Sequence, residues 1–229
     1  MKNYYLTTVC ILVVVYAFFS SCSNETVQKD SKQIIELTGD NIDVSRAKSI
    51  AEQNGVEDTQ IYQWKNHIVF YSYINEVDKF TGKLKNNFPK SRVKIYEKPF
   101  YNFSKSERCA DTAVAADWKH IILTANLVED EKMQQEYLNY HNTQFTEWPE
   151  IAQGFCNADF QQLLVYKNGR QLMLVISIPA DKTLDELNPK TTENNPRVDD
   201  WNRIMGKYQE GIEGTAPGEK WVFLDKVAI

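Results

Sequence analysis

The pattern of apolar and polar positions predicts the same order of strands and helices twice along this chain. The first pass lies within residues 32–103, where runs rich in β-branched and aromatic residues alternate with segments of helical periodicity. The strands expected there are 33–38, 59–64, 67–74 and 92–100, and the expected helices are 43–53 and 76–87. This order predicts a ferredoxin-like β-α-β-β-α-β unit, which forms a half-barrel.

A polar, alanine-containing segment at residues 104–116 has no strong period, so we expect it to be a linker. The same order then begins again within residues 117–229. The strands expected there are 118–127, 160–166, 171–178 and 221–227, and the expected helices are 130–148 and 197–209. The repeat is visible in its hairpins, since residues 61–66 read IYQWKN and residues 163–168 read LLVYKN.

One ferredoxin-like sheet leaves a face that must be covered, and two stacked copies can cover each other. We therefore predict an α+β fold in which tandem ferredoxin-like repeats form an intramolecular pseudo-dimeric α+β barrel. Two chains of a homodimer often make the same contact, so this arrangement can replace dimerisation and leave the protein a monomeric pseudo-dimer.

Residues 1–22 have the pattern of a bacterial lipoprotein signal peptide. Lys2 precedes an almost unbroken apolar run at 6–19, and two serines stand directly before Cys22. The pattern predicts an exported protein anchored to a membrane through lipid on Cys22, with residues 23–31 as a polar tether. An ordinary cleaved signal and an anchor that is retained whole are the alternatives.

Charge and cysteine content narrow the classes of partner. The formal net charge of -5, with no run of Lys and Arg longer than two residues, argues against a nucleic-acid surface. Export would permit Cys109 and Cys156 to pair, but the sequence does not establish whether they are close enough. Neither has a neighbour at C-x-x-C spacing, so we expect no zinc site and no other metal.

Candidate chemistry gathers in the helix expected at 130–148. Tyr137 and His141 are four residues apart and so project from one helical face. An imidazole can give and take protons near neutral pH, and a phenol one turn away can position a hydroxyl group. The alternative is an amphipathic helix packed on a sheet, with the histidine simply hydrogen-bonded.

Further motifs give residues 117–229 a resemblance to the L-rhamnose mutarotase family. The matching pieces occur in family order and cover nearly the whole half. They are Glu136-Tyr137, Tyr140-His141, Trp148-Pro149-Glu150, Val165-Tyr166 with Asn168, Asn195-Pro196-Arg197-Val198, Trp201, Met205 and Pro217-Gly218-Glu219-Lys220-Trp221-Val222.

The resemblance implies interconversion of the α and β anomers of an L-sugar such as L-rhamnose, an isomerase activity with a monosaccharide substrate and no cofactor. It implies His141 as the acid/base. The residues it implies for substrate binding are Tyr137, Trp201, Trp148, Tyr166 and Asn195. Mutarotation needs one proton removed from the anomeric hydroxyl and one delivered to the ring oxygen, which a histidine can perform.

The chain departs from the family pattern at three places, one of which is Asp200-Trp201, where some members have tandem tryptophans. Trp-Pro-Glu usually follows the histidine by four residues, whereas here Trp148 follows His141 by seven. A binding position that is usually tyrosine falls on Leu163. The amide- and hydroxyl-rich loop at 187–196 is long and is a candidate for rebuilding the polar side of the pocket.

Two other functions compete with the mutarotase. The first is a carbohydrate-binding lipoprotein that has lost turnover, which Leu163 and the inserted turn favour. The second is an oxygenase or haem-degrading enzyme with His141 as an iron ligand, by analogy of fold alone. We expect His67 and His120 to serve packing, and the leading helix of the first repeat has no counterpart of His141.

Overall fold

The first repeat forms the predicted ferredoxin-like unit. The structure is a computed structural model that describes residues 32–54 and 56–227. The elements of the first repeat are β1 (Gln33–Thr38), α1 (Val44–Gln53), β2 (Glu57–Trp64), β3 (His67–Tyr73), α2 (Val77–Asn87) and β4 (Arg92–Tyr96). The predicted signal peptide, the tether and Cys22 lie outside the described residues.

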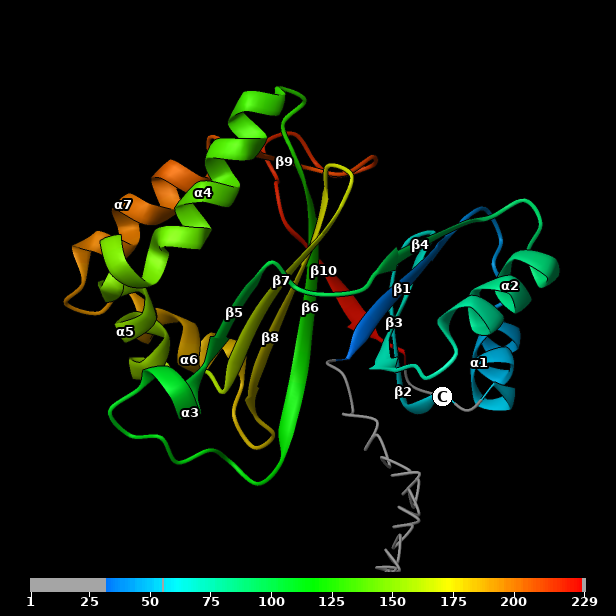
Figure 1. The fold of residues 1–229 in the computed structure, drawn as a ribbon, viewed down its shortest axis with the longest axis horizontal. Helices are drawn as coiled ribbons and strands as arrows, with labels where there is room; N and C mark the ends of the chain where they lie inside the picture. The colour runs from blue at the N-terminus through cyan, green and yellow to red at the C-terminus, as the bar shows by residue number, and fades with distance from the viewer. Residues whose placement is uncertain (1–31, 55, 228–229) are drawn as a thin grey trace, which may run out of the picture. The chain divides into compact units, whose positions relative to one another are not determined.

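The second repeat has the same core elements together with several additions. Its elements are β5 (Tyr101–Ser104), α3 (Lys105–Arg108), β6 (Trp118–Leu127), α4 (Glu131–Glu147), α5 (Pro149–Asn157), β7 (Gln162–Asn168), β8 (Gln171–Pro179), α6 (Leu184–Leu187), the 3₁₀-helix η1 (Asn188–Thr191), α7 (Pro196–Met205), β9 (Gln209–Glu210) and β10 (Val222–Lys226). Figure 1 shows α1 and α2 against the first group of strands and α4, α5 and α7 against the second.

All strands of the described residues belong to one antiparallel sheet in the order β4-β1-β3-β2-β10-β6-β8-β7-β5, with β9 on β6. Each half therefore carries its fourth, first, third and second strands side by side, which is the ferredoxin-like order. The halves join where β10 pairs with β2 through Asp225 opposite Gln63 and Lys226 opposite Tyr62. The predicted α+β class and the tandem ferredoxin-like repeats are confirmed.

Local sequence explains why these elements form. The Asp43 side chain caps α1 by accepting a hydrogen bond from the backbone N–H of Arg46 at 3.0 Å. The β2–β3 turn places Lys65 at a φ of 49°, and the β7–β8 turn places Gly169 at a φ of 58°, both in the left-handed region. The tight turns of the two repeats thus coincide with the Lys-Asn and Asn-Gly pairs of the sequence.

Side-chain alternation along the strands produces three clusters of buried residues. One face of each half packs under its own helices, as with Ile35 of β1 and Leu174 of β8. The other faces of both halves share one apolar cluster, which includes Ile34 and Tyr62 from the first half and Tyr166 and Met173 from the second. This shared cluster is the contact that the two repeats were predicted to make.

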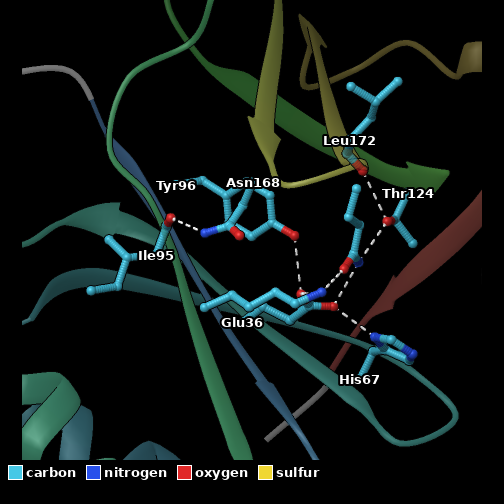
Figure 2. A network of polar contacts seen from close by, with 9 residues as sticks. Glu36, His67, Ile95, Tyr96, Thr124, Asn168 and Leu172 are labelled. Carbon is cyan, nitrogen blue, oxygen red and sulfur yellow. Dashed lines mark hydrogen bonds and ion pairs between the residues drawn. The ribbon is translucent and has the colours of Figure 1, made fainter. Parts of the chain in front are cut away.

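A buried polar network crosses the same contact between the halves (Figure 2). The fully buried Glu36 carboxylate of β1 accepts hydrogen bonds from His67 Nδ1 at 2.6 Å, Tyr96 Oη at 3.0 Å and Gln171 Nε2 at 2.9 Å. Gln171 belongs to β8, so the second half supplies one partner of a carboxylate in the first. His67, which was expected to serve packing, is a hydrogen-bonded partner of Glu36 within this network.

Two boundaries differ from the prediction. The strand expected at 92–100 ends at Tyr96, and the separate strand β5 pairs antiparallel with β7 of the second half. A further helix, α5, begins at Pro149, directly after the helix that was expected to span 130–148. Both additions lie beside the candidate site.

Cys109, directly after α3, and Cys156, in α5, form a disulfide bond with a Cα–Cα distance of 5.6 Å. This answers the question that the sequence left open. The bond ties the segment after β5 to the helix that follows α4, and it closes a loop with a sequence separation of 47 residues.

Replacing Cys109 and Cys156 with serine should lower the free energy of unfolding by about 4 kcal/mol, because the unfolded chain regains the conformational entropy of that loop. Urea denaturation monitored by circular dichroism measures the change. The oxidised wild type and the wild type treated with reductant should differ by a similar amount, whereas the reductant should leave the serine variant unaffected. An equal free energy of unfolding for the oxidised wild type and the serine variant would show that the bond does not stabilise the fold.

Candidate functional site

A cavity of about 570 Å³ lies on the helix-covered face of the second half. Its floor is apolar sheet, and its walls come from α4, α5, η1, α7 and the segment after α7. The floor residues are Leu163, Val165, Leu174 and Ile176, and the polar residues of the walls and rim include Tyr137, His141, Gln144, Asn188, Thr191, Thr192, Asn202, Gln209 and Lys220. The volume falls within the range of roughly 300–1,000 Å³ that is usual for small-molecule sites.

The α4 helix brings Tyr137 and His141 together on the cavity wall, as their spacing predicted. Asp130 caps its start by accepting a hydrogen bond from the backbone N–H of Met133 at 2.9 Å. The rings of Tyr137 and His141 are 4.3 Å apart between centroids. Both side chains are largely buried and both line the cavity, so a ligand in the cavity meets the phenol and the imidazole side by side.

His141 is held in its neutral form with one defined tautomer. Its Nδ1–H donates to the backbone carbonyl of Tyr137 at 3.0 Å, which leaves Nε2 as the unprotonated ring nitrogen. Burial lowers the pKa of the imidazole to about 4, although the hydrogen bond to that carbonyl acts in the opposite direction. At neutral pH, His141 therefore presents a lone pair and can act as a general base.

Tyr137 is kept protonated and is oriented by a short hydrogen-bonded chain. Burial raises the pKa of its phenol above the usual value, while the hydrogen bond from Gln209 acts to lower it. Gln209 Nε2 donates to Tyr137 Oη at 3.3 Å, and Gln209 Oε1 accepts from Trp221 Nε1 at 3.1 Å. Because Gln209 already donates to this hydroxyl, the phenol proton remains free to point at a ligand.

Trp201 lines the cavity from α7, with its ring centroid 5.3 Å from that of His141. Trp148 does not line it. The Trp148 indole lies behind, between the Trp201 ring at 5.6 Å and the guanidinium carbon of Arg197 at 3.9 Å. Trp201 can thus present a flat apolar surface to a sugar, whereas Trp148 supports Trp201.

Besides Trp148, two residues expected at the substrate lie elsewhere. Tyr166 lies on the opposite face of the sheet, because side chains alternate along β7 and its neighbour Val165 faces the cavity; its hydroxyl donates to the carbonyl of Lys32 at 2.8 Å. Asn195 precedes α7, and its amide donates to the carbonyl of Glu150 at 2.8 Å. Neither residue lines the cavity.

Several polar or aromatic residues of the cavity were not assigned a role from the sequence, and four of them bear on its chemistry. They are Tyr101, Gln144, Gln209 and Lys220. A signal existed for Gln144, because Tyr137, His141 and Gln144 follow the i, i+4, i+7 spacing of one helical face. Lys220 adjoins Trp221 in the quoted C-terminal motif and donates to the carbonyl of Gly206. Tyr101 gave no signal, because the strand that carries it was not predicted.

Three further features of the described residues concern metal binding, membrane-spanning helices and His120. Across residues 32–54 and 56–227, no cluster of three or more His, Cys, Asp or Glu has the geometry to hold a metal ion. Within the same ranges, no helix has the length and apolarity to cross a membrane. His120 forms a hydrogen bond with Ser177 Oγ at 2.8 Å and packs on the Tyr71 ring in a T-shaped arrangement, as expected for a packed histidine.

Comparison with known proteins agrees with this geometry. The model of the L-rhamnose mutarotase family matches residues 120–227. The second half of the chain is therefore similar to that family. The mutarotase-family half holds the whole α4–α7 cavity wall together with its sheet floor, so interconversion of sugar anomers is the general activity that the match supports.

Individual relatives are distant. An L-fucose mutarotase of Xanthomonas campestris is 26% identical over 101 residues, which are 42% of this chain and 75% of the relative. A UPF0734 protein of Dictyostelium discoideum is 26% identical over 116 residues, 49% of this chain and 90% of the relative. A monooxygenase-like protein of Listeria innocua has a similar structure with a TM-score of 0.41 and 14% identity, covering 87% of this chain and 95% of its own.

Proposed function

We propose that this protein interconverts the α and β anomers of a 6-deoxy-L-hexose such as L-rhamnose or L-fucose, with His141 as the acid/base. The observation that carries the proposal is the neutral His141 imidazole, whose Nδ1–H is engaged by the carbonyl of Tyr137 while the ring borders the cavity. A buried neutral imidazole is a better base toward a hydroxyl group than an imidazolium ion.

In this mechanism, Nε2 of His141 removes the proton of the anomeric hydroxyl. The bond between C1 and the ring oxygen breaks, the ring oxygen takes that electron pair, and C1 becomes an aldehyde. The imidazolium ion then delivers its proton to the former ring oxygen, which was bonded to the same carbon. After rotation about the bond between C1 and C2, the same steps in reverse close the ring to the other anomer.

Tyr137 has a separate role in this scheme. Its phenol donates a hydrogen bond to the ring oxygen and stabilises the negative charge that develops there as the ring opens. The apolar floor at Leu163, Leu174 and Ile176, with the Trp201 indole beside it, suits the methyl group and the apolar face of a deoxy sugar. These features support a deoxy sugar over one with a hydroxyl group at every carbon.

Anomeric exchange measured by saturation-transfer NMR tests the proposal. The purified protein should accelerate exchange of L-rhamnose or L-fucose above the buffer rate and should accelerate D-glucose less. No acceleration of any sugar in a panel of deoxy and simple hexoses would refute the enzyme. Saccharide binding in calorimetry without exchange would instead support a carbohydrate-binding protein that has lost turnover.

The pH dependence of this exchange follows from the buried imidazole. Because burial lowers the pKa of His141 to about 4, the base form predominates throughout the neutral range. The enzyme-dependent kcat/KM should therefore be level down to about pH 5 and fall below it, with a midpoint near 4. Subtraction of the buffer rate at each pH isolates the enzyme. A midpoint near 6.5, the ordinary value for histidine, would show that the imidazole is solvated in the working enzyme.

We further propose that the protein is exported and anchored through lipid on Cys22. The signal pattern at residues 1–22 motivates this, and the Cys109–Cys156 disulfide supports an oxidising compartment. Expression in a bacterial host with labelled palmitate should label the wild type in the membrane fraction and leave Cys22→Ser unlabelled. A labelled Cys22→Ser protein would refute the anchor at this residue.

A further inference from the structure

We propose that Tyr101 and Gln144 form a second polar sub-site in the cavity, which binds a ring hydroxyl group of the sugar other than the anomeric one. This inference rests on the proposed function, since it names how the same cavity recognises its monosaccharide. It adds a binding group beyond Tyr137 and His141.

The first observation is an unpartnered amide in the cavity wall. Gln144 is fully buried and lines the cavity, yet its Nε2 has no hydrogen-bond partner among the described residues. Leaving such a donor unpaired costs about 1–3 kcal/mol, so buried amides almost always have partners. A sugar hydroxyl that accepts a hydrogen bond from this amide would satisfy it.

The second observation is that the amide is held in one orientation. Tyr101 Oη donates to Gln144 Oε1 at 3.0 Å, so the carbonyl end is occupied and only the N–H end is available. The Tyr101 ring stacks on Phe145 with 5.4 Å between centroids, and its centroid lies 5.3 Å from that of His141 in a T-shaped arrangement. Burial raises the pKa of the Tyr101 phenol, which therefore keeps the proton that it donates.

The third observation is the position of this pair relative to the reacting centre. Gln144 follows His141 by three residues and Tyr137 precedes it by four, so the three groups lie on successive turns of one face of α4. A pyranose carries hydroxyl groups on contiguous ring carbons. One ring can therefore place its anomeric carbon at His141 and another hydroxyl at Gln144.

Tyr101 comes from a strand that the first repeat does not have, and Gln144 comes from the segment between His141 and Trp148. Tyr101 stands on β5, an edge strand that pairs with β7 and sets Tyr101 opposite Val165 of the cavity floor. Gln144 stands in the turn that separates His141 from Trp148. The sub-site thus contributes to the sugar specificity of this chain. It forms where β5 contacts the turn of α4 that carries Gln144.

Kinetics of anomeric exchange on single-hydroxyl deletions test the sub-site. The proteins are the wild type, Gln144→Met, Tyr101→Phe and the double variant Tyr101→Phe/Gln144→Met. Gln135→Met, which changes an exposed glutamine of the same helix, is the matched control. The probes are the preferred sugar and its monodeoxy analogues, and both kcat and KM are measured.

We expect Gln144→Met to raise KM for the preferred sugar about tenfold with little change in kcat, because binding is lost equally in the ground and transition states. Tyr101→Phe should raise KM less, since the amide remains but is no longer oriented. For one monodeoxy analogue, the wild type and Gln144→Met should have the same KM, which identifies the hydroxyl that the amide binds. Gln135→Met should match the wild type throughout.

Stability separates this role from a structural one. The double variant removes the unpartnered donor and leaves no phenol without an acceptor, so its thermal midpoint should equal or exceed that of the wild type while KM stays raised. A lower midpoint with an unchanged KM would overturn the sub-site. So would a KM within about twofold of the wild type for every probe.

The sub-site can still be tested if the protein is not a mutarotase. If the wild type accelerates no exchange, calorimetric titration of the wild type and Gln144→Met with the same sugars replaces the kinetics. Binding by the wild type that Gln144→Met weakens about tenfold keeps the sub-site and refutes only the enzyme. Equal binding by both proteins, or binding by neither, overturns the sub-site.

Discussion

Replacing His141 with alanine is expected to abolish the acceleration of anomeric exchange, with a loss of about 10²–10⁴-fold in kcat. The imidazole performs both proton transfers in the proposed mechanism, so its removal leaves ring opening to water. Saturation-transfer NMR under the conditions that show wild-type exchange measures the loss. Circular dichroism should show an unchanged fold, because His141 donates only one hydrogen bond, to a carbonyl of its own helix.

His120→Ala is the matched control for this variant. His120 is also partly buried, and burial lowers its pKa to about 4, but it bonds to Ser177 on the other side of the sheet and does not line the cavity. It should retain the wild-type rate. Full exchange activity in His141→Ala would remove the imidazole from the mechanism, and loss of activity in both variants would point to damage of the fold.

Replacing Glu36 with alanine should lower the free energy of unfolding by about 4 kcal/mol. The carboxylate is fully buried and accepts from His67, Tyr96 and Gln171, and Lys94 Nζ lies 3.8 Å from it. Its removal leaves the Tyr96 phenol without its acceptor at the contact between the halves and leaves Gln171 Nε2 with Thr124 Oγ1 as its remaining acceptor. Urea denaturation measures the change, and Glu52→Ala, which removes an exposed ion pair with Lys48, should change stability by less than about 1 kcal/mol.

The pH dependence of this difference gives an independent check. Burial acts to raise the pKa of Glu36, but the hydrogen bond from His67 and the charge of Lys94 outweigh it and hold the pKa below its usual value. A lowered folded-state pKa contributes stability that is fully present above the unfolded value of about 4.5 and is lost as the pH falls through the folded value. The wild type and Glu36→Ala should therefore converge in stability in acid. A constant difference from pH 7 into strong acid would contradict the role of the charge.

The repeat and its sheet order were predictable because they follow from local patterns. Each half presents its strands and helices with clear periods, and the ferredoxin-like order follows from that sequence of elements. The orientation of Tyr166, which points into the cluster shared by both halves, was not predictable in the same way. A strand buried on both faces shows no alternation of apolar and polar residues, so β7 gave no sign of which side chains face the helices.

From the sequence, only the site residues that lie on α4 were predictable. Tyr137, His141 and Gln144 share a helical spacing, and the first two were assigned from it. Tyr101 reaches the cavity through β5, and four residues are too few for a period to show. Asn195 was assigned by motif, yet a motif does not state whether an amide near a helix start turns toward a ligand or toward a neighbouring carbonyl.

Pairing of β10 with β2 makes both halves one continuous sheet within a single chain. A barrel assembled from two separate chains falls apart when its concentration drops below the dissociation constant, and its activity per molecule falls with it. Covalent connection replaces that bimolecular equilibrium with an effective local concentration that dilution does not alter. The specific activity of this protein should thus be the same at nanomolar and micromolar concentrations.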